Sequence, residues 1–76
     1  METKREVLNN LHSTLDVLEQ VESDYFLKGN KVQSHMVNTL VGIGTDLLSS
    51  MTHKKKLSIT DMIKVSTYYT ICKAYI

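Results

Sequence analysis

The sequence contains no proline, no tryptophan, three glycines and one cysteine among its 76 residues. Proline and glycine usually provide the frequent turns of a many-stranded β fold, so their scarcity argues against such a fold. The single cysteine, Cys72, excludes an intramolecular disulfide. A lone thiol is compatible with a reducing compartment, and we therefore expect a cytoplasmic protein. Hydrophobic residues make up 42% of the chain, which is too many for a disordered segment.

The sequence also lacks a long hydrophobic run. Its longest stretch without a charged residue covers residues 32–45 and includes several polar side chains, whereas a membrane-spanning helix needs about 20 predominantly apolar residues. The first residues lead directly into an amphipathic pattern and not into the apolar core of a signal peptide. We therefore expect one soluble domain over residues 1–76 that makes no contact with a membrane.

The net charge of +1 conceals a strong asymmetry. Residues 1–28 carry three basic side chains against six acidic ones, and residues 29–76 carry six lysines against two aspartates. Such an asymmetry suggests either that the two parts pack on each other or that one of them faces a partner.

Three helix-start signals divide the chain. Residues 3–6 read Thr-Lys-Arg-Glu, a capping box, and residues 58–61 read Ser-Ile-Thr-Asp, which has the same character. Residues 30–33 form a looser version that begins with asparagine, and Gly29 just before it is a typical helix stop. The sequence therefore predicts helices over residues 4–28, 31–52 and 59–75.

Helical periodicity then predicts which side chains form the core. The first helix has one apolar face, whose members are Val7, Leu8, Leu11, Leu15, Leu18, Val21, Tyr25 and Phe26. The second helix has two apolar stripes, so we expect it to touch two neighbours. Its main stripe consists of Val32, Met36, Leu40, Ile43, Leu47 and Met51, and its second of Val37, Val41 and Leu48. Gly42 and Gly44 inside it either permit a close approach or a mild bend, or divide the helix into two pieces.

The third helix is apolar around most of its circumference. We expect its core stripe to consist of Met62, Val65, Tyr69, Cys72 and Ile76, which Tyr68, Ile71 and Tyr75 widen on one side. A chain of this size is too small to bury so much of one helix, so we expect a partner. The predicted fold is an all-α three-helix bundle, a long helical hairpin plus a C-terminal helix, completed by dimerisation with C2 symmetry.

The sequence offers two sets of candidate protein-interface residues, one on the first helix and one on the third. Glu22 falls on the apolar face of the first helix, where it either pairs with a lysine or histidine at an interface or reaches solvent from the helix end. Tyr68, Ile71 and Tyr75 are the other candidates, because tyrosine combines a large apolar area with a polar tip. The alternative for the tyrosines is that Tyr69 is in the core and the other two lie at the edge with their hydroxyls in water.

Motifs for catalysis, cofactors and metals are absent from the sequence. The histidines and Cys72 do not have metal-ligand spacing, and Cys72 lies on an apolar stripe that would disfavour its thiolate. Residues 41–46 begin like a dinucleotide-binding loop but lack its third glycine. We therefore expect no enzymatic activity, no cofactor and no metal.

The leading hypothesis is a small non-catalytic protein that binds another protein through an apolar and tyrosine-bearing helical surface. It would act as a regulator, inhibitor or adaptor of the kind that phages and mobile elements encode, and it would form a homo-oligomer. The alternative is a nucleic-acid-associated factor whose basic loop, Lys54, Lys55 and Lys56, contacts phosphates. Against this alternative, the third helix has apolar residues where a recognition helix needs polar or basic ones.

Overall fold

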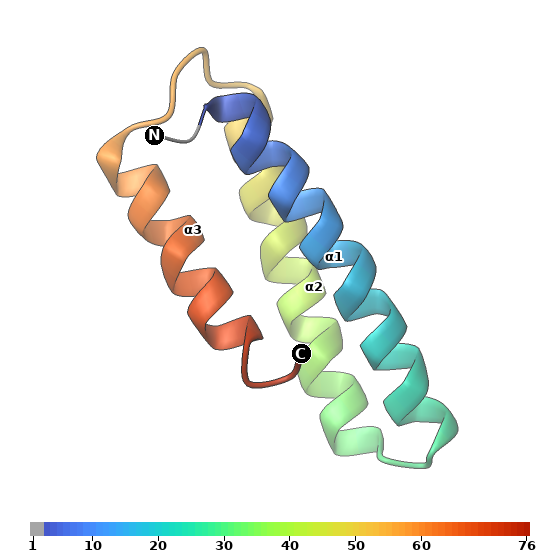
Figure 1. The fold of residues 1–76 in the computed structure, drawn as a ribbon. Coiled ribbons are helices and arrows are strands. Elements are labelled where there is room, and N and C mark those ends of the chain that lie inside the picture. The colour runs from blue at the N-terminus through green and yellow to red at the C-terminus, as the bar shows by residue number, and fades with distance from the viewer. Residues whose placement is uncertain (1–2) are drawn as a thin grey trace.

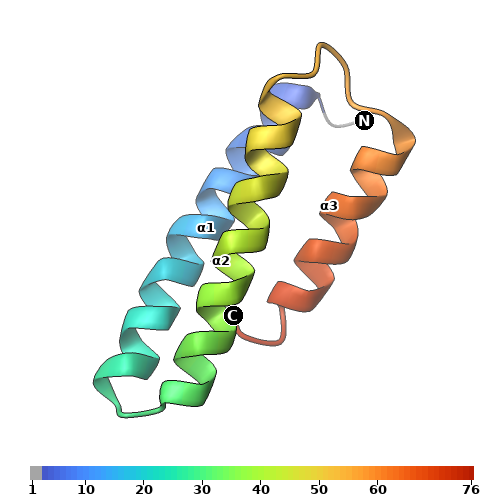
Figure 2. The ribbon, with the colours of Figure 1, turned by 180° about the vertical axis from the view of Figure 1, so that it is seen from behind.

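The computed structural model describes residues 3–76 and contains three helices (Figure 1), which are α1 (Lys4–Leu27), α2 (Lys31–Thr52) and α3 (Ile59–Cys72). The first two form a long antiparallel hairpin, and α3 runs along one side of it, antiparallel to α2 (Figure 2). No strand occurs in residues 3–76, so the prediction of an all-α fold is confirmed. Glu2, one of the six acidic residues in the first part of the sequence, lies outside the described residues.

The predicted caps start all three helices. Thr3 Oγ1 accepts a hydrogen bond from the backbone N–H of Glu6 at 3.2 Å, and the side chain of Asn30 caps α2 in the same way. At α3 the capping box is complete, because Ser58 Oγ accepts from the N–H of Asp61 and the Asp61 carboxylate accepts from the N–H of Ser58. These bonds satisfy backbone donors that have no partner inside a helix.

Gly29 turns the chain between α1 and α2. Its φ of 79° places it in the left-handed region, which glycine adopts without steric strain. Its N–H donates to the carbonyl of Phe26 at 3.0 Å, and the N–H of Asn30 donates to the carbonyl of Tyr25 at 2.9 Å. This pair of bonds is the Schellman motif. It ends α1 and reverses the chain within a few residues, so that α2 begins at Lys31 and packs antiparallel to α1.

The core follows the hairpin. Val7, Leu11, Leu15 and Leu18 of α1 are buried, as the periodicity predicts. Phe26, which was expected on the same face, is 63% exposed, so that part of the prediction is wrong. Phe26 lies in the last turn of α1, beyond the part of the hairpin along which α3 runs. The structure therefore has no third element to cover the hairpin there.

The main apolar stripe of α2 is only partly covered. Leu40 and Met51 are buried, but Val32, Met36 and Ile43 are exposed. The side of α2 that is buried includes Val37 and Gly44 instead. α2 packs against both α1 and α3, so the prediction that this helix touches two neighbours is confirmed, although half of its main stripe remains exposed.

The third helix differs from the prediction in its end and in its rotation. It ends at Cys72 and not at residue 75, and residues 73–76 turn back toward α2, where Tyr75 Oη lies 3.8 Å from Met36 Sδ. The helix buries Asp61, Val65, Tyr68 and Cys72, whereas Ile76 is exposed and Met62 and Tyr69 are only partly buried.

Candidate protein-binding surface

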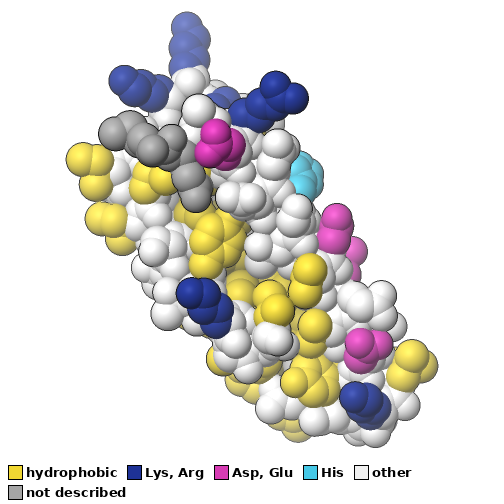
Figure 3. Space-filling view, viewed as in Figure 1, with side chains coloured by type: hydrophobic (Ala, Val, Ile, Leu, Met, Phe, Trp, Pro, Cys, Tyr) yellow, Lys and Arg dark blue, Asp and Glu magenta, His cyan; other side chains and the backbone are white. Residues whose placement is uncertain are grey.

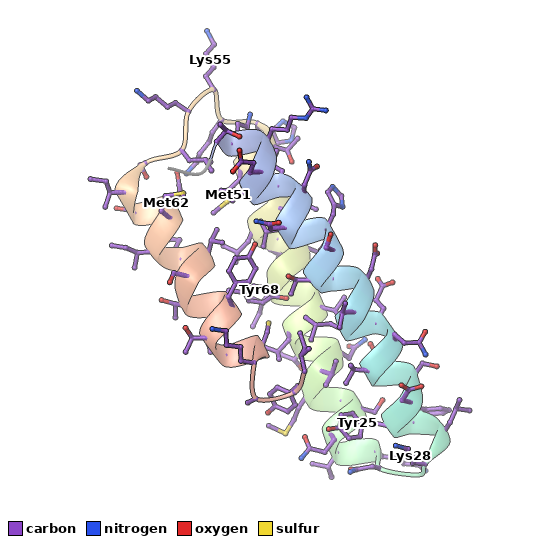
Figure 4. The ribbon with its side chains drawn as sticks, in the orientation of Figure 1. Tyr25, Lys28, Met51, Lys55, Met62 and Tyr68 are labelled. Atoms are coloured by element: carbon purple, nitrogen blue, oxygen red, sulfur yellow. The ribbon has the colours of Figure 1, made fainter. Side chains whose placement is uncertain are left out.

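Tyr68 fixes α3 against α2, and Figure 4 shows it pointing from α3 toward the hairpin. Its Oη donates a hydrogen bond to the carbonyl of Leu40 at 2.6 Å, and its side chain packs against Gly44. A Cβ at Gly44 would lie 2.7 Å from both Tyr68 Cζ and Leu15 Cδ2. Gly44 thus permits a close approach within an unbroken helix, whereas nothing lies within 4 Å of a Cβ at Gly42.

Two potentially reactive groups are held in their neutral forms. Burial raises the pKa of the Tyr68 hydroxyl well above its ordinary value and raises the pKa of the Cys72 thiol. Cys72 is 1% exposed, in agreement with the prediction that it is a small core residue. A buried neutral thiol is a poor nucleophile. Tyr68 and Cys72 therefore contribute to the packing of α3 and not to a reactive site.

The loop before α3 is fixed by charged hydrogen bonds. Lys54 Nζ donates to Asp61 Oδ1 at 2.6 Å. This bond, together with the backbone N–H of Ser58, lowers the pKa of Asp61 from its ordinary value of 3.8 to about 2. From the start of α1, Lys4 Nζ donates to the carbonyl of Thr52 at 3.2 Å and to that of Lys54. Lys54, one lysine of the predicted basic loop, is therefore paired with an aspartate of the same chain.

Lys55 and Lys56 are exposed in this loop. Lys55 points away from the bundle in Figure 4. Figure 3 shows lysine and arginine side chains gathered at this end of the molecule, while acidic side chains lie along the flank of α1. The charge asymmetry of the sequence thus becomes an asymmetry of the folded surface.

An apolar groove runs between α2 and α3. Its wider part encloses about 300 Å³ and is lined by Leu40, Ile43, Leu47, Ile63, Lys64, Thr67, Tyr68 and Ile71. A second hollow of about 270 Å³ continues it and is lined by His35, Met36, Thr39, Leu40, Ile71 and Tyr75. Leu40 and Ile71 line both hollows, so they form one continuous depression, which we call the α2–α3 groove. Ile43, Ile63 and Ile71 are 47%, 60% and 48% exposed.

The structure brings Tyr68, Ile71 and Tyr75 of the predicted interface residues to the α2–α3 groove. Ile71 is exposed and Tyr75 is partly exposed. Tyr68 is only 3% exposed, because its hydroxyl donates to the buried carbonyl of Leu40 on α2. The alternative that Tyr68 lies at the edge with its hydroxyl in water is therefore wrong.

Glu22 lies away from the groove, where its half-buried side chain bridges α1 to α2 at the surface. Both of its carboxylate oxygens accept from Asn38 Nδ2 at 3.2 Å. The partner within the chain is thus an amide, and the pairing of Glu22 with a lysine or histidine at an interface stays a prediction.

The sequence pattern assigns Ile43 and Leu47 to the main stripe of α2, but Ile43 is exposed and Leu47 is only partly buried. Ile63 lies nearly opposite the predicted core stripe of the third helix, and it is exposed. Two apolar helix faces without a covering element indicate a surface that needs a partner.

In residues 3–76 no group of three histidine, cysteine or acidic side chains is placed to hold a metal ion. None of the described helices combines the length and hydropathy that crossing a membrane requires. Comparison of the chain with protein-family models, with curated proteins and with solved structures found no match.

Proposed function

We propose that this chain is a small non-catalytic protein-binding module, a regulator, inhibitor or adaptor, whose binding surface is the α2–α3 groove. The observation that supports the proposal is the run of half-exposed isoleucines, Ile43, Ile63 and Ile71, around one continuous apolar depression. Contiguous exposed apolar surface on a small protein is typical of an interaction site.

The chemistry of the lining favours a polypeptide over a small substrate. Lys64 is the one lining residue with a formal charge at neutral pH, and Thr67, Thr39 and Tyr75 supply hydroxyls. Catalytic sites bring together titratable groups with shifted pKa values, and the α2–α3 groove contains no such cluster. A long, shallow and apolar depression suits the side of a helix.

Capture experiments with two matched variants test this proposal. The chain is immobilised and incubated with an extract of its native host, beside Ile63→Gln in the groove and Val17→Gln on α1. Both positions are exposed apolar helix positions, and Val17 does not line the groove. We expect Ile63→Gln to lose the bound protein and Val17→Gln to retain it. Equal retention by both variants would refute the assignment of the groove.

Self-association is read out in the same series by sedimentation over a range of concentrations. A dimer that dissociates on Ile63→Gln would identify a second copy as the bound protein and would still support binding through the groove. A monomer at every concentration would leave the groove to a foreign partner.

The alternative function, nucleic-acid binding, is favoured by the exposed lysines at the loop end (Figure 3). The structure weakens it, because Lys54 is bonded to Asp61 and only Lys55 and Lys56 of the predicted trio remain free of such a bond. A labelled DNA duplex at low salt tests it, since phosphate contacts weaken steeply as salt rises. Binding that is lost in a Lys55→Gln and Lys56→Gln double variant would support the alternative.

A further inference from the structure

The nature of the partner can be inferred from the α2–α3 groove together with the charges around it, an inference that rests on the proposed function. We propose that the groove binds an amphipathic helix of another protein, with its apolar side on Ile43, Ile63 and Ile71 and acidic side chains toward Lys64 and the basic loop.

The shape of the groove fits a helix. Its two hollows are continuous through Leu40 and Ile71 and lie alongside α3, which spans residues 59–72. At about 1.5 Å per residue, α3 is roughly 21 Å long, which equals about four helical turns. A partner helix of that length would present apolar residues at every third or fourth position, the usual pattern of a helix bound in a groove.

The charges around the groove select an acidic partner. Between residues 53 and 76 the exposed side chains with a formal charge are all lysines, and Asp46, the exposed acid of α2, is not among the residues that line the groove. The acid in this segment, Asp61, is buried and bonded to Lys54. Lys64 lines the groove itself, and Lys55 and Lys56 lie with Ile59 and Met62 in the depression at the start of α3. Complementary charge speeds association and excludes partners of the wrong sign.

The same charges disfavour a second copy of this chain. A two-fold dimer brings the same patch of both copies together, so contact through this surface would place two lysine-bearing α3 helices against each other. A nucleic-acid backbone fits the groove poorly as well, because affinity for it comes from Lys and Arg side chains that neutralise several phosphates and the lining supplies Lys64 alone.

Three synthetic peptides of about 15 residues test the proposal by fluorescence anisotropy. The first has leucines at helical spacing flanked by glutamates. The second has lysines in place of the glutamates. The third keeps the first composition in a scrambled order, which removes the apolar side. We expect the acidic amphipathic peptide to bind at least about tenfold more tightly than either control. Its affinity should fall as salt rises from about 50 to about 500 mM.

Variants of the chain locate the peptide. Ile63→Gln should weaken binding about tenfold while Val17→Gln leaves it unchanged. Lys64→Gln should weaken binding of the acidic peptide at low salt and reduce its salt dependence, whereas Lys28→Gln at the far end of the hairpin should do neither. Circular dichroism confirms that each variant is folded before the titration.

Several results would overturn the proposal. One is equal binding of the acidic and basic peptides, and another is unchanged peptide binding by both groove variants, Ile63→Gln and Lys64→Gln. The others are tighter binding of a DNA duplex than of the acidic peptide, and self-association that depends on Ile63. If no peptide binds but Ile63→Gln still abolishes capture from the extract, the acidic-helix proposal fails and the proposed function stands.

Discussion

α3 packs tightly against Gly44 of α2 through the Tyr68 ring, so Gly44→Ala is an informative single substitution. In an exposed helix interior, replacing glycine by alanine stabilises a protein by about 0.5–1 kcal/mol. At Gly44 the added methyl group would lie 2.7 Å from Leu15 Cδ2 and from Tyr68 Cζ. It would also collide with the hydroxyl that donates to Leu40.

The expected magnitude follows from these contacts. Inserting a methyl group into a packed core costs about 1–3 kcal/mol, and loss of the Tyr68 hydrogen bond adds about 1 kcal/mol. After subtraction of the helix-propensity gain, Gly44→Ala should reduce the free energy of unfolding by about 1–3 kcal/mol. For a domain of this size that corresponds to a fall in melting temperature of at least about 4 °C.

Gly42→Ala is the matched control. It lies on the same helix, two residues away, with nothing within 4 Å of the added Cβ, so it should raise stability by about 0.5–1 kcal/mol. Thermal and urea unfolding followed by circular dichroism measures both variants.

The second control removes part of the obstacle. In a Tyr68→Ala background, Gly44→Ala should cost less stability than in the wild-type chain, because the added methyl group no longer meets the ring, while Leu15 Cδ2 still lies 2.7 Å away. The packing argument is refuted if Gly44→Ala and Gly42→Ala stabilise the wild-type chain equally.

Three further outcomes follow from the buried groups. The pKa of Asp61 is lower in the folded chain than its ordinary value of 3.8, so its stabilising contribution is present above pH 3.8 and lost as the pH falls toward about 2. Acid unfolding of Asp61→Asn should lack this component. The pKa of Tyr68 is raised in the folded chain, so the unfolded chain loses the proton first and the free energy of unfolding should decline above pH 10.0. The decline should be smaller in Tyr68→Phe, a substitution that itself costs about 1 kcal/mol of stability at neutral pH. Leu18→Ala should cost about 2–5 kcal/mol, whereas Phe26→Ser, at an exposed site, should change stability by less than about 0.5 kcal/mol; thermal melts check both.

The hairpin was predictable because its signals are local. A capping threonine, a left-handed glycine and a capping asparagine each act within a few residues of their own position. Such interactions can be read from adjacent letters of a sequence. The leucines of α1 add a periodic pattern that marks the buried face of that helix.

The third helix was harder to predict because its buried side includes polar groups. Asp61 can be buried because Lys54 donates a hydrogen bond to its carboxylate. Tyr68 can be buried because its hydroxyl donates a hydrogen bond to the carbonyl of Leu40. Neither pairing can be read from helical periodicity, which assigns polar side chains to the surface. The prediction consequently placed the core side of α3 about one residue away from its real position and put Tyr68 at the edge.

The groove was hidden from the sequence for a related reason. Periodicity identifies Met36, Ile43 and Leu47 as one apolar stripe, but it does not show which stripe α3 covers. Tyr68 docks on Gly44, which lies one helical turn after Leu40 at the edge of the main stripe. This packing holds α3 along that edge and leaves Met36 and Ile43 exposed.

The most direct test of binding through the α2–α3 groove is isoleucine methyl NMR during titration with the protein that the chain captures. The methyl signals of Ile43, Ile63 and Ile71 should shift or broaden, because these side chains line the groove. The signal of Ile76, which is exposed and lines a different hollow, should stay in place. Shifts confined to Ile76, with the groove isoleucines unchanged, would contradict the account.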